Sequence, residues 1–141
     1  MTKQRTEQDV LDELKSNHDI ESMVGFDNLN IQEKLQNNTF LMIKYKELYI
    51  REKAIYETLE DKYEKLKGMR YHHYRFESDL ELKKAEIEAY YLPKDLKILQ
   101  MKRILRMQKI RVDFFDTCAK AFEKRQWCMN TFSNNMRGGA I

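Results

Sequence analysis

Apolar residues recur at helical spacing along most of the chain. Between residues 31 and 66, positions three and four apart are apolar or aromatic with few exceptions, Asn38 among them. Such an alternation, held for about five heptads, is typical of a helix that packs along one face. The pattern predicts a long helix over about 28–67, with Asp27 or Asn28 as its N-cap.

A second pattern of the same kind covers about 93–131. Its seam runs from Ile98 to Met129, and a parallel stripe of apolar residues lies beside it. Proline is accepted in the first turn of a helix and disfavours a helical conformation in the residue before it. Pro93 therefore predicts the start of this helix and a break at about 89–92.

Shorter patterns fill the rest of the chain. Residues 6–17 predict a short helix within an N-terminal segment and linker, 1–25, and 78–90 predict a connecting helix. Residues 133–141 have no capping signal, so we expect a frayed tail. We interpret the whole chain as a single domain.

Glycine and proline are too scarce for a protein rich in turns. The 141 residues include four Gly and one Pro, whereas sheets and barrels need many turns. The chain is therefore expected to be all-α, with the two long helices folded into an antiparallel hairpin. The glycine-rich loops that bind dinucleotides or nucleoside triphosphates are also absent from the sequence.

Other classes are disfavoured by simple counts. The sequence has no apolar run as long as a membrane span, and it starts with polar residues, so we expect no membrane association. On a helix Cys118 and Cys128 lie about 15 Å apart, too far for a disulfide. Adjacent His72 and His73 point in different directions, so no metal site is expected. Nothing in the sequence indicates an enzyme or a cofactor.

Residues 62–76 combine cations with aromatic rings. This segment has a formal charge of +4, and its tyrosines alternate with lysines and arginines. Cations neutralise the phosphates of single-stranded nucleic acid, and rings stack on its bases. The candidate DNA-binding residues are Lys65, Lys67, Arg70, Tyr71, Tyr74 and Arg75. The alternative stays open that these cations only favour the helix dipole and these tyrosines only complete the seam.

A second basic block, 94–111, has a formal charge of +6. If the hairpin forms, this block approaches the basic end of the first long helix. The alternative is a solvated basic face that pairs with the acidic segment 78–90.

A lone hairpin cannot cover all the aromatic residues of the second long helix, which predicts a homo-oligomer. We expect 112–132 to form a main contact between subunits. The candidate contact residues are Phe114, Phe115, Phe122 and Trp127.

The order of several segments resembles the UvsY recombination mediators of T4-like phages, in particular those of cyanophages. The resemblance covers about 11–140 and runs through LDELK, KYKELYIREKAIYETLEDKYEKLK, RYHHYRF, KKAEIEAYYLPKDLKIL and KIRVDFFDTCAKAFEKRQWCMNTFSNNMRGG. Arg70 matches an arginine of the family's basic stretch, and Lys67 lies within one residue of its lysine. The family's paired tyrosines fall on His73 and Tyr74, and no glycine follows them here.

This resemblance implies a helical protein without catalytic activity that forms a ring in the hexamer or heptamer range. Members of the family hold single-stranded DNA and help a RecA-like recombinase replace the phage single-strand-binding protein, in recombination, repair and recombination-dependent replication. The implied location is the cytoplasm of the infected bacterium. The family's oligomerisation helix corresponds to about 112–132. The alternative function is a structural coiled-coil or assembly protein with no role on nucleic acid.

Overall fold

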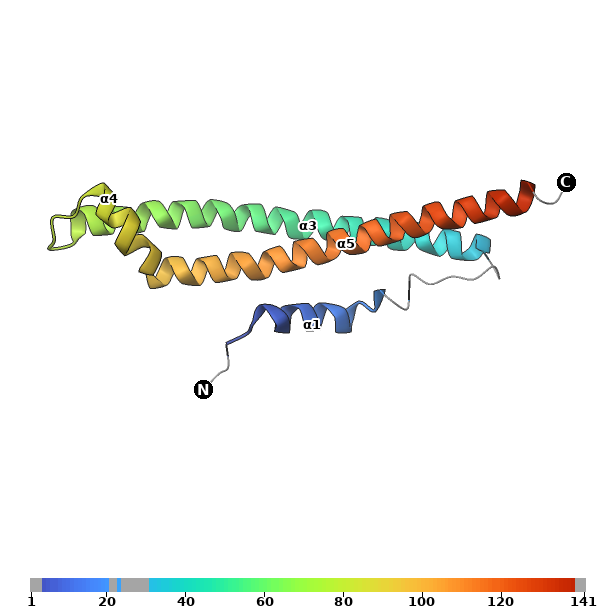
Figure 1. Ribbon diagram of the computed structural model, residues 1–141, viewed down its shortest axis with the longest axis horizontal. Helices are drawn as coiled ribbons and strands as arrows, with labels where there is room; N and C mark the ends of the chain where they lie inside the picture. Colours follow the sequence, from blue (N-terminus) through green and yellow to red (C-terminus); the bar gives the residue numbers. More distant parts are fainter. Residues whose placement is uncertain (1–3, 21–22, 24–30, 139–141) are drawn as a thin grey trace. The chain divides into compact units, whose positions relative to one another are not determined.

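The computed structural model describes residues 4–20, 23 and 31–138, and within this part every regular element is helical. The elements are α1 (Glu7–Asn17), α3 (Ile31–His72), α4 (Lys84–Glu86) and α5 (Leu96–Gly138), with short π- and 3₁₀-helical segments between α3 and α5 (Figure 1). None of the described residues lies in a β-strand. The all-α prediction is confirmed.

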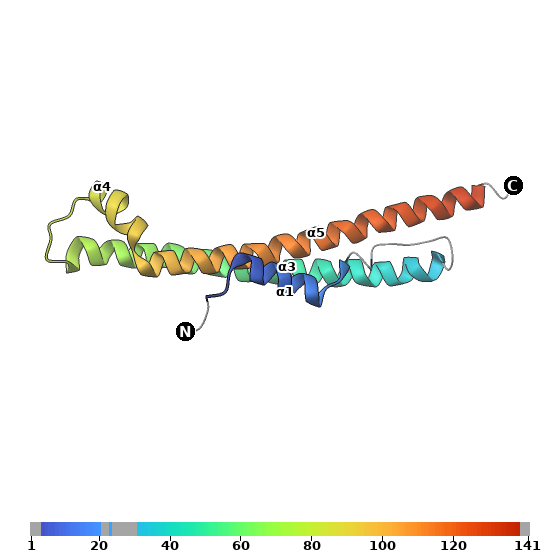
Figure 2. The ribbon, with the colours of Figure 1, turned by 60° about the horizontal axis from the view of Figure 1, so that its bottom comes forward.

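The chain divides into two compact units. We call Met1–Glu52 with Ile110–Ile141 the terminal unit, because it contains both ends of the chain, and Lys53–Lys109 the turn unit. Helices α3 and α5 pass through both units, and within each unit they lie side by side (Figures 1 and 2). The predicted long helical hairpin is confirmed.

The polar contacts of the terminal unit show that α3 and α5 are antiparallel. Gln32 donates a hydrogen bond to the Ser133 hydroxyl at 3.2 Å. One turn and a half further along α3, the Asn38 side-chain amide donates to the Phe122 carbonyl at 2.9 Å and to Gln126 at 2.7 Å. As residue numbers rise on α3, those of the partners on α5 fall, which defines the register.

Asn38, the polar exception in the predicted seam, is completely buried. Its side-chain oxygen also accepts a hydrogen bond from the guanidinium of Arg125, at 3.3 Å. Burial lowers the pKa of Arg125. A buried amide whose hydrogen bonds are satisfied at only one alignment of two helices favours that alignment over a shifted one. Asn38 therefore helps to fix the register of the terminal unit.

Aromatic rings fill the centre of the terminal unit. The Tyr45 ring stacks on Phe122 with centroids 5.2 Å apart, and both side chains are fully buried. The Tyr45 hydroxyl and His18 Nδ1 are hydrogen-bonded at 2.8 Å, and the His18 ring meets Phe115 edge-on. Burial and, secondarily, the charge of Lys44 lower the pKa of His18. This cluster joins the end of α1 to both long helices.

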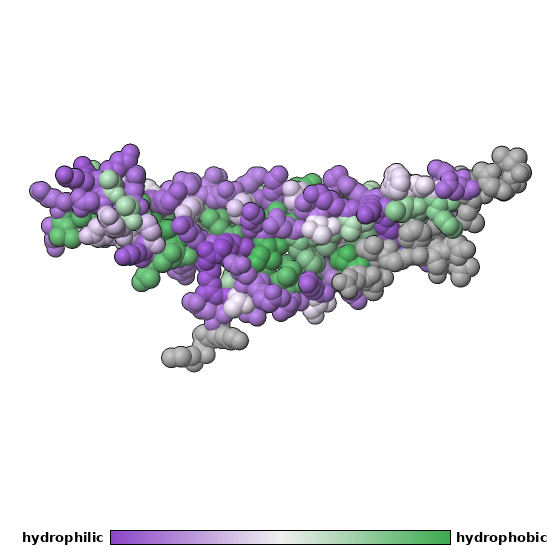
Figure 3. Space-filling model, in the orientation of Figure 1, coloured by the Kyte–Doolittle hydropathy of each residue, from purple (hydrophilic) through white to green (hydrophobic). Residues whose placement is uncertain are grey.

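Helix α1 ends where predicted, begins one residue after the predicted start, and has a complete N-cap. The Thr6 hydroxyl accepts from the backbone N–H of Asp9, and the Asp9 carboxylate accepts from the backbone N–H of Thr6. This reciprocal capping box satisfies two donors that the first turn leaves open. Val10 and Leu14, one turn apart, are the buried residues of the helix. Figure 3 shows hydrophobic residues gathered where α1 meets α5 in the terminal unit.

Three predicted boundaries of the long helices differ from the structure. Helix α5 begins at Leu96 and not at Pro93, which lies in the preceding 3₁₀-helix. Helix α5 continues to Gly138, so the expectation of a frayed tail is wrong for 133–138. Ser133 is buried and bonded to Gln32, and this packing holds the last turns in place. Helix α3 continues past residue 67 to His72. The predicted N-caps, positions 27 and 28, and residues 139–141 lie outside the described part of the chain.

The connection between the long helices also differs from prediction. After α3, a π-helical turn covers His73–Glu77, and helix resumes only at Lys84, not at 78. The backbone of Ser78 is extended, which ends the helical pattern there, and its hydroxyl donates to the Tyr74 carbonyl at 2.8 Å.

The predicted break at 89–92 is also wrong. A π-helix, Ile87–Tyr91, leads into a 3₁₀-helix, Leu92–Lys94, which accepts proline near its start, and the extended residue is Asp95.

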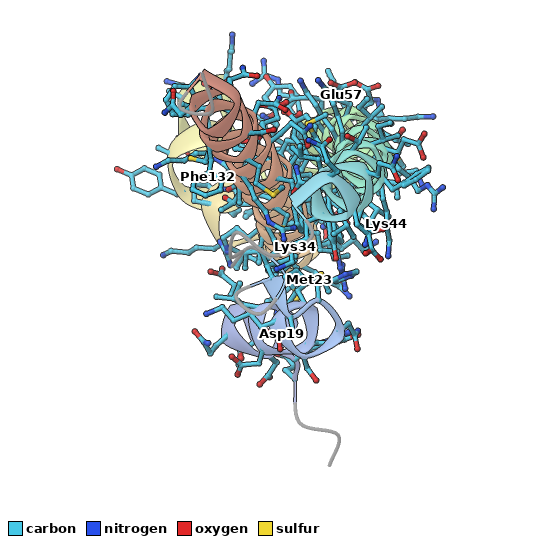
Figure 4. The ribbon with its side chains drawn as sticks, turned by 90° about the vertical axis from the view of Figure 1, so that its right-hand side faces the viewer. Asp19, Met23, Lys34, Lys44, Glu57 and Phe132 are labelled. Carbon is cyan, nitrogen blue, oxygen red and sulfur yellow. The ribbon has the colours of Figure 1, made fainter. Side chains whose placement is uncertain are left out.

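Charged side chains cover the outer faces of the long helices. Lys44 in the terminal unit and Glu57 in the turn unit are exposed, each on the side of α3 that faces away from α5 (Figure 4). Among the described helices, none combines the length and the apolar character needed to cross a membrane.

We expect Phe122→Ala to lower the free energy of unfolding by about 3–5 kcal/mol, because it empties the centre of the aromatic cluster. Leu96→Ala is the control, since Leu96 lies on the same helix with 81% of its surface exposed. It should change stability by about 0.5 kcal/mol or less. Urea unfolding followed by circular dichroism measures both, and equal losses would contradict this packing.

Candidate nucleic-acid interface

The turn unit is organised around the carboxylate of Asp95. This residue stands immediately before α5, and its Oδ1 accepts the backbone N–H of Ile98 at 3.0 Å, as an N-cap does. Its Oδ2 accepts from Arg70 Nε at 2.8 Å and from the Tyr74 hydroxyl at 2.5 Å. The side chain of Asp95 is only 2% exposed. We call Asp95, Arg70 and Tyr74 the Asp95 cluster.

The electrostatics of the Asp95 cluster favour its charged form. Burial alone would raise the pKa of Asp95, but the hydrogen bonds from Tyr74, Arg70 and Ile98 outweigh burial and lower it. The hydrogen bond to Asp95 is the largest cause that raises the pKa of Arg70, and it likewise raises the pKa of Tyr74. The Arg70 guanidinium also lies over the Tyr74 ring, 5.3 Å from its centroid. The ion pair is therefore intact at neutral pH.

Three of the six predicted DNA-binding residues hold the turn together. Arg70 and Tyr74 bind Asp95, and Arg75 Nη1 donates to the Leu82 carbonyl at 2.6 Å. Sequence reasoning missed Asp95, although an aspartate just before a long helical pattern is a recognised N-cap signal. The contact with Arg70, 25 positions away, has no local signal in the sequence.

The other predicted residues lie on the surface of α3. Lys65 is exposed, and Tyr71 is partly exposed. Lys67 pairs with Glu64 at 3.0 Å and lies 4.8 Å from the centroid of the Tyr63 ring. Lys67 is thus partly neutralised, whereas Lys65 extends into solvent.

Cations from α3 and from the start of α5 surround one hollow of about 550 Å³. We call it the basic hollow, and its charged and titratable lining consists of Lys65, Arg70, His72, His73, Lys97 and Glu77. Glu77 lies 3.0 Å from His73 Nδ1 and 3.6 Å from His72 Nδ1. The hydrogen bond with His73 lowers the pKa of Glu77. The structure thus brings Lys97, from the second basic block, beside the first block.

Gly68, in the interior of α3, lies in the same hollow. A Cβ added there would meet nothing within 4 Å. A glycine inside a helix costs stability relative to alanine. The structure thus shows space for a side chain at position 68 beside the basic hollow.

The structure divides the four candidate oligomerisation residues. Phe115 and Phe122 are 4% and 0% exposed, since they pack inside the terminal unit of one chain. Phe114 is partly exposed, and Trp127 points into solvent. Phe114 and Trp127 therefore have surface to offer a second subunit, whereas Phe115 and Phe122 stabilise the single chain.

The two cysteines are not joined in a disulfide. Cys118 and Cys128 are both free thiols, and burial raises the pKa of Cys118 to about 11. Among the residues that the structure describes, no three His, Cys, Asp or Glu side chains come together as metal ligands would.

The fold is similar to that of two crystal structures of the bacteriophage T4 recombination mediator protein UvsY, in different lattice types. One has a TM-score of 0.76 and 19% sequence identity, and the other has 0.73 and 20%. In both cases 93% of this chain and 98% of the other chain are covered. The fold expected from the resemblance is confirmed. No family model and no curated protein matches the sequence.

We expect Asp95→Ala to lower the free energy of unfolding at pH 7 by about 3–5 kcal/mol, since it leaves Arg70 without its buried partner. The folded-state pKa of Asp95 is lowered, so its contribution is complete above the unfolded value of about 3.9 and is lost as the pH falls through the lower folded value. The difference from the parent should therefore shrink below pH 4.

Urea unfolding at pH 7 and pH 3 measures this difference. Asp113→Asn is the matched control, because it removes an exposed carboxylate from the same helix. If Asp95→Ala lowers the free energy of unfolding equally at both pH values, the charge of Asp95 does not contribute to stability.

Proposed function

We propose that this chain is a recombination mediator that binds single-stranded DNA and helps a RecA-like recombinase load onto DNA covered by single-strand-binding protein. The fold is that of a protein described as a recombination mediator, along nearly the whole chain. Its place of action would be the cytoplasm of an infected bacterium. The proposed role needs neither a catalytic group nor a cofactor.

The single observation that carries the DNA-binding part of this proposal is the basic hollow. Lys65 and Lys97 come from different helices and are both exposed at its rim. A phosphodiester strand whose phosphates these two lysines neutralise releases its condensed counterions, and this gain does not depend on base sequence. A mediator has to bind any sequence, so recognition of the backbone suits the task.

We also propose that the chain acts as a ring-like homo-oligomer. One hollow offers few cations, so a single protomer should bind weakly. Several copies that contact one strand gain affinity through avidity without any new contact. The contact between subunits is proposed to lie in 112–132, on the exposed Trp127 and the partly exposed Phe114. Such an assembly would hold DNA extended for the recombinase.

The rival function is a structural coiled coil without a nucleic-acid role. It explains the long hairpin but does not explain why cations from two helices line the basic hollow. Cations at a helix end would favour the dipole. The dipole alone does not require the cations at the end of α3 to lie beside Lys97, which is in the first turn of α5. Titration of labelled oligo(dT) at low and high salt separates the two functions.

Lys65→Gln with Lys97→Gln should weaken binding to all single strands and flatten the salt dependence. Each phosphate contact removed should reduce the magnitude of the slope of log affinity against log salt by about 0.7, so the double variant should reduce it by about 1.4. Arg70 is left unchanged, because its removal would also break the Asp95 cluster. Fluorescence anisotropy with labelled oligo(dT) over a salt series measures the slope.

The matched control is Lys46→Gln with Lys120→Gln, which removes two exposed lysines from the same two helices in the terminal unit. It should keep the parent slope. The DNA site lies elsewhere if both double variants behave alike.

Trp127→Asp should dissociate the oligomer and lower its native mass, since it places a charge in the proposed contact. Affinity for long oligo(dT) should fall by a factor of about 10²–10⁴ although every cation is retained. Asn130→Asp adds the same charge at an exposed position of α5 and should change neither quantity. Mass photometry and anisotropy measure the two effects, and an unchanged mass for Trp127→Asp would count against this contact.

A further inference from the structure

A second hollow of the turn unit, of about 650 Å³, adjoins the Asp95 cluster. We call it the tyrosine hollow, and it is lined by Tyr74, Glu86, Tyr90, Tyr91 and Lys94. The two hollows adjoin through Asp95, because its Oδ2 binds Arg70, which lines the basic hollow, and Tyr74, which lines the tyrosine hollow.

Two of the three rings in the tyrosine hollow are held in place. The Tyr74 hydroxyl is fixed by Asp95, and the Tyr74 and Tyr91 rings lie 5.4 Å apart, tilted by 48°. Tyr90, by contrast, is 66% exposed. Large aromatic side chains bury much apolar surface when they find a partner, so a ring left this open beside fixed rings offers a stacking face.

The charges of the tyrosine hollow differ from those of the basic hollow. Lys94 is balanced by Glu86, so a phosphate gains little there and meets a carboxylate. An unpaired nucleobase is neutral and has a π-face for stacking. Its N–H groups can donate hydrogen bonds to a carboxylate. The chemistry of this hollow suits a base rather than the backbone.

We propose that the tyrosine hollow binds an unpaired nucleobase, stacked on Tyr90, while the neighbouring phosphates lie in the basic hollow. This inference rests on the proposed single-strand binding and adds base contacts to it. The Asp95 cluster then sets the spacing between the site for bases and the site for phosphates. Every base has a π-face, so the contact needs no particular sequence.

The test compares oligo(dT) with an abasic deoxyribose-phosphate strand of the same length, for the parent, Tyr90→Leu and Tyr90→Phe. The parent should bind oligo(dT) more tightly than the abasic strand. Tyr90→Leu should weaken the affinity for oligo(dT) by about fivefold to more than a hundredfold per base contact, and its affinity for the abasic strand should not change. Tyr90→Phe keeps the ring and should bind like the parent.

Each contrary result has a distinct meaning. An equal drop in affinity for both strands in Tyr90→Leu, or an unchanged affinity for oligo(dT), would overturn the stacking site and leave phosphate binding intact. The same holds if the parent binds the two strands equally. Failure of the parent to bind either strand would instead overturn the proposed function. Far-UV circular dichroism of Tyr90→Leu checks that the exposed substitution leaves the fold unchanged.

Discussion

The turn between the two long helices depends on one buried carboxylate. Asp95 caps the first turn of α5 and, with its other oxygen, binds a cation and a hydroxyl from the end of α3. A carboxylate with 2% of its surface exposed is stable in its charged form only if its hydrogen bonds are made. The end of α3 and the start of α5 are thereby tied to one geometry, and the surfaces built on them share it.

This constraint divides the cations of the turn unit into two groups. Arg70 and Arg75 stabilise the connection, because their donors bind Asp95 and the Leu82 carbonyl. Lys65 and Lys97 extend from the helices that the connection aligns, so they have charge to offer a ligand. Basic residues next to one another in sequence therefore differ in role. A substitution at Arg70 would change both folding and binding and could not separate them.

Periodicity predicted much of the fold because it records which side of each helix is buried. The two seams became the packed faces of α3 and α5, including Asn38, whose burial a simple hydropathy count would not suggest. The bounds of α1 were also predictable to within one residue. The extension of α5 to Gly138 was not, because it depends on the contact between Ser133 and Gln32, about 100 positions apart. Periodicity placed Phe115 and Phe122 on the second seam, and they pack there within their own chain, although they were also predicted to contact a second subunit.

The location of the candidate site was predictable from the sequence, but the roles of its individual residues were not. Charge and aromatic content located the end of α3, and the hairpin brought a cation of the second basic block beside it. The roles of Arg70 and Tyr74 were missed because an ion pair between distant segments has no sequence periodicity. The tyrosine hollow was missed for the same reason, since Tyr74 and Tyr90 lie on separate segments that only the folded turn brings together.

The most direct test of the central claim, that the turn unit is the surface for single-stranded DNA, is lysine footprinting. The protein is acetylated with and without oligo(dT), and the modification of each lysine is read by mass spectrometry. We expect protection of Lys65, Lys94 and Lys97, while Lys46 and Lys120 in the terminal unit react as they do in the free protein. Protection confined to the terminal unit, with Lys65, Lys94 and Lys97 unchanged, would contradict the claim.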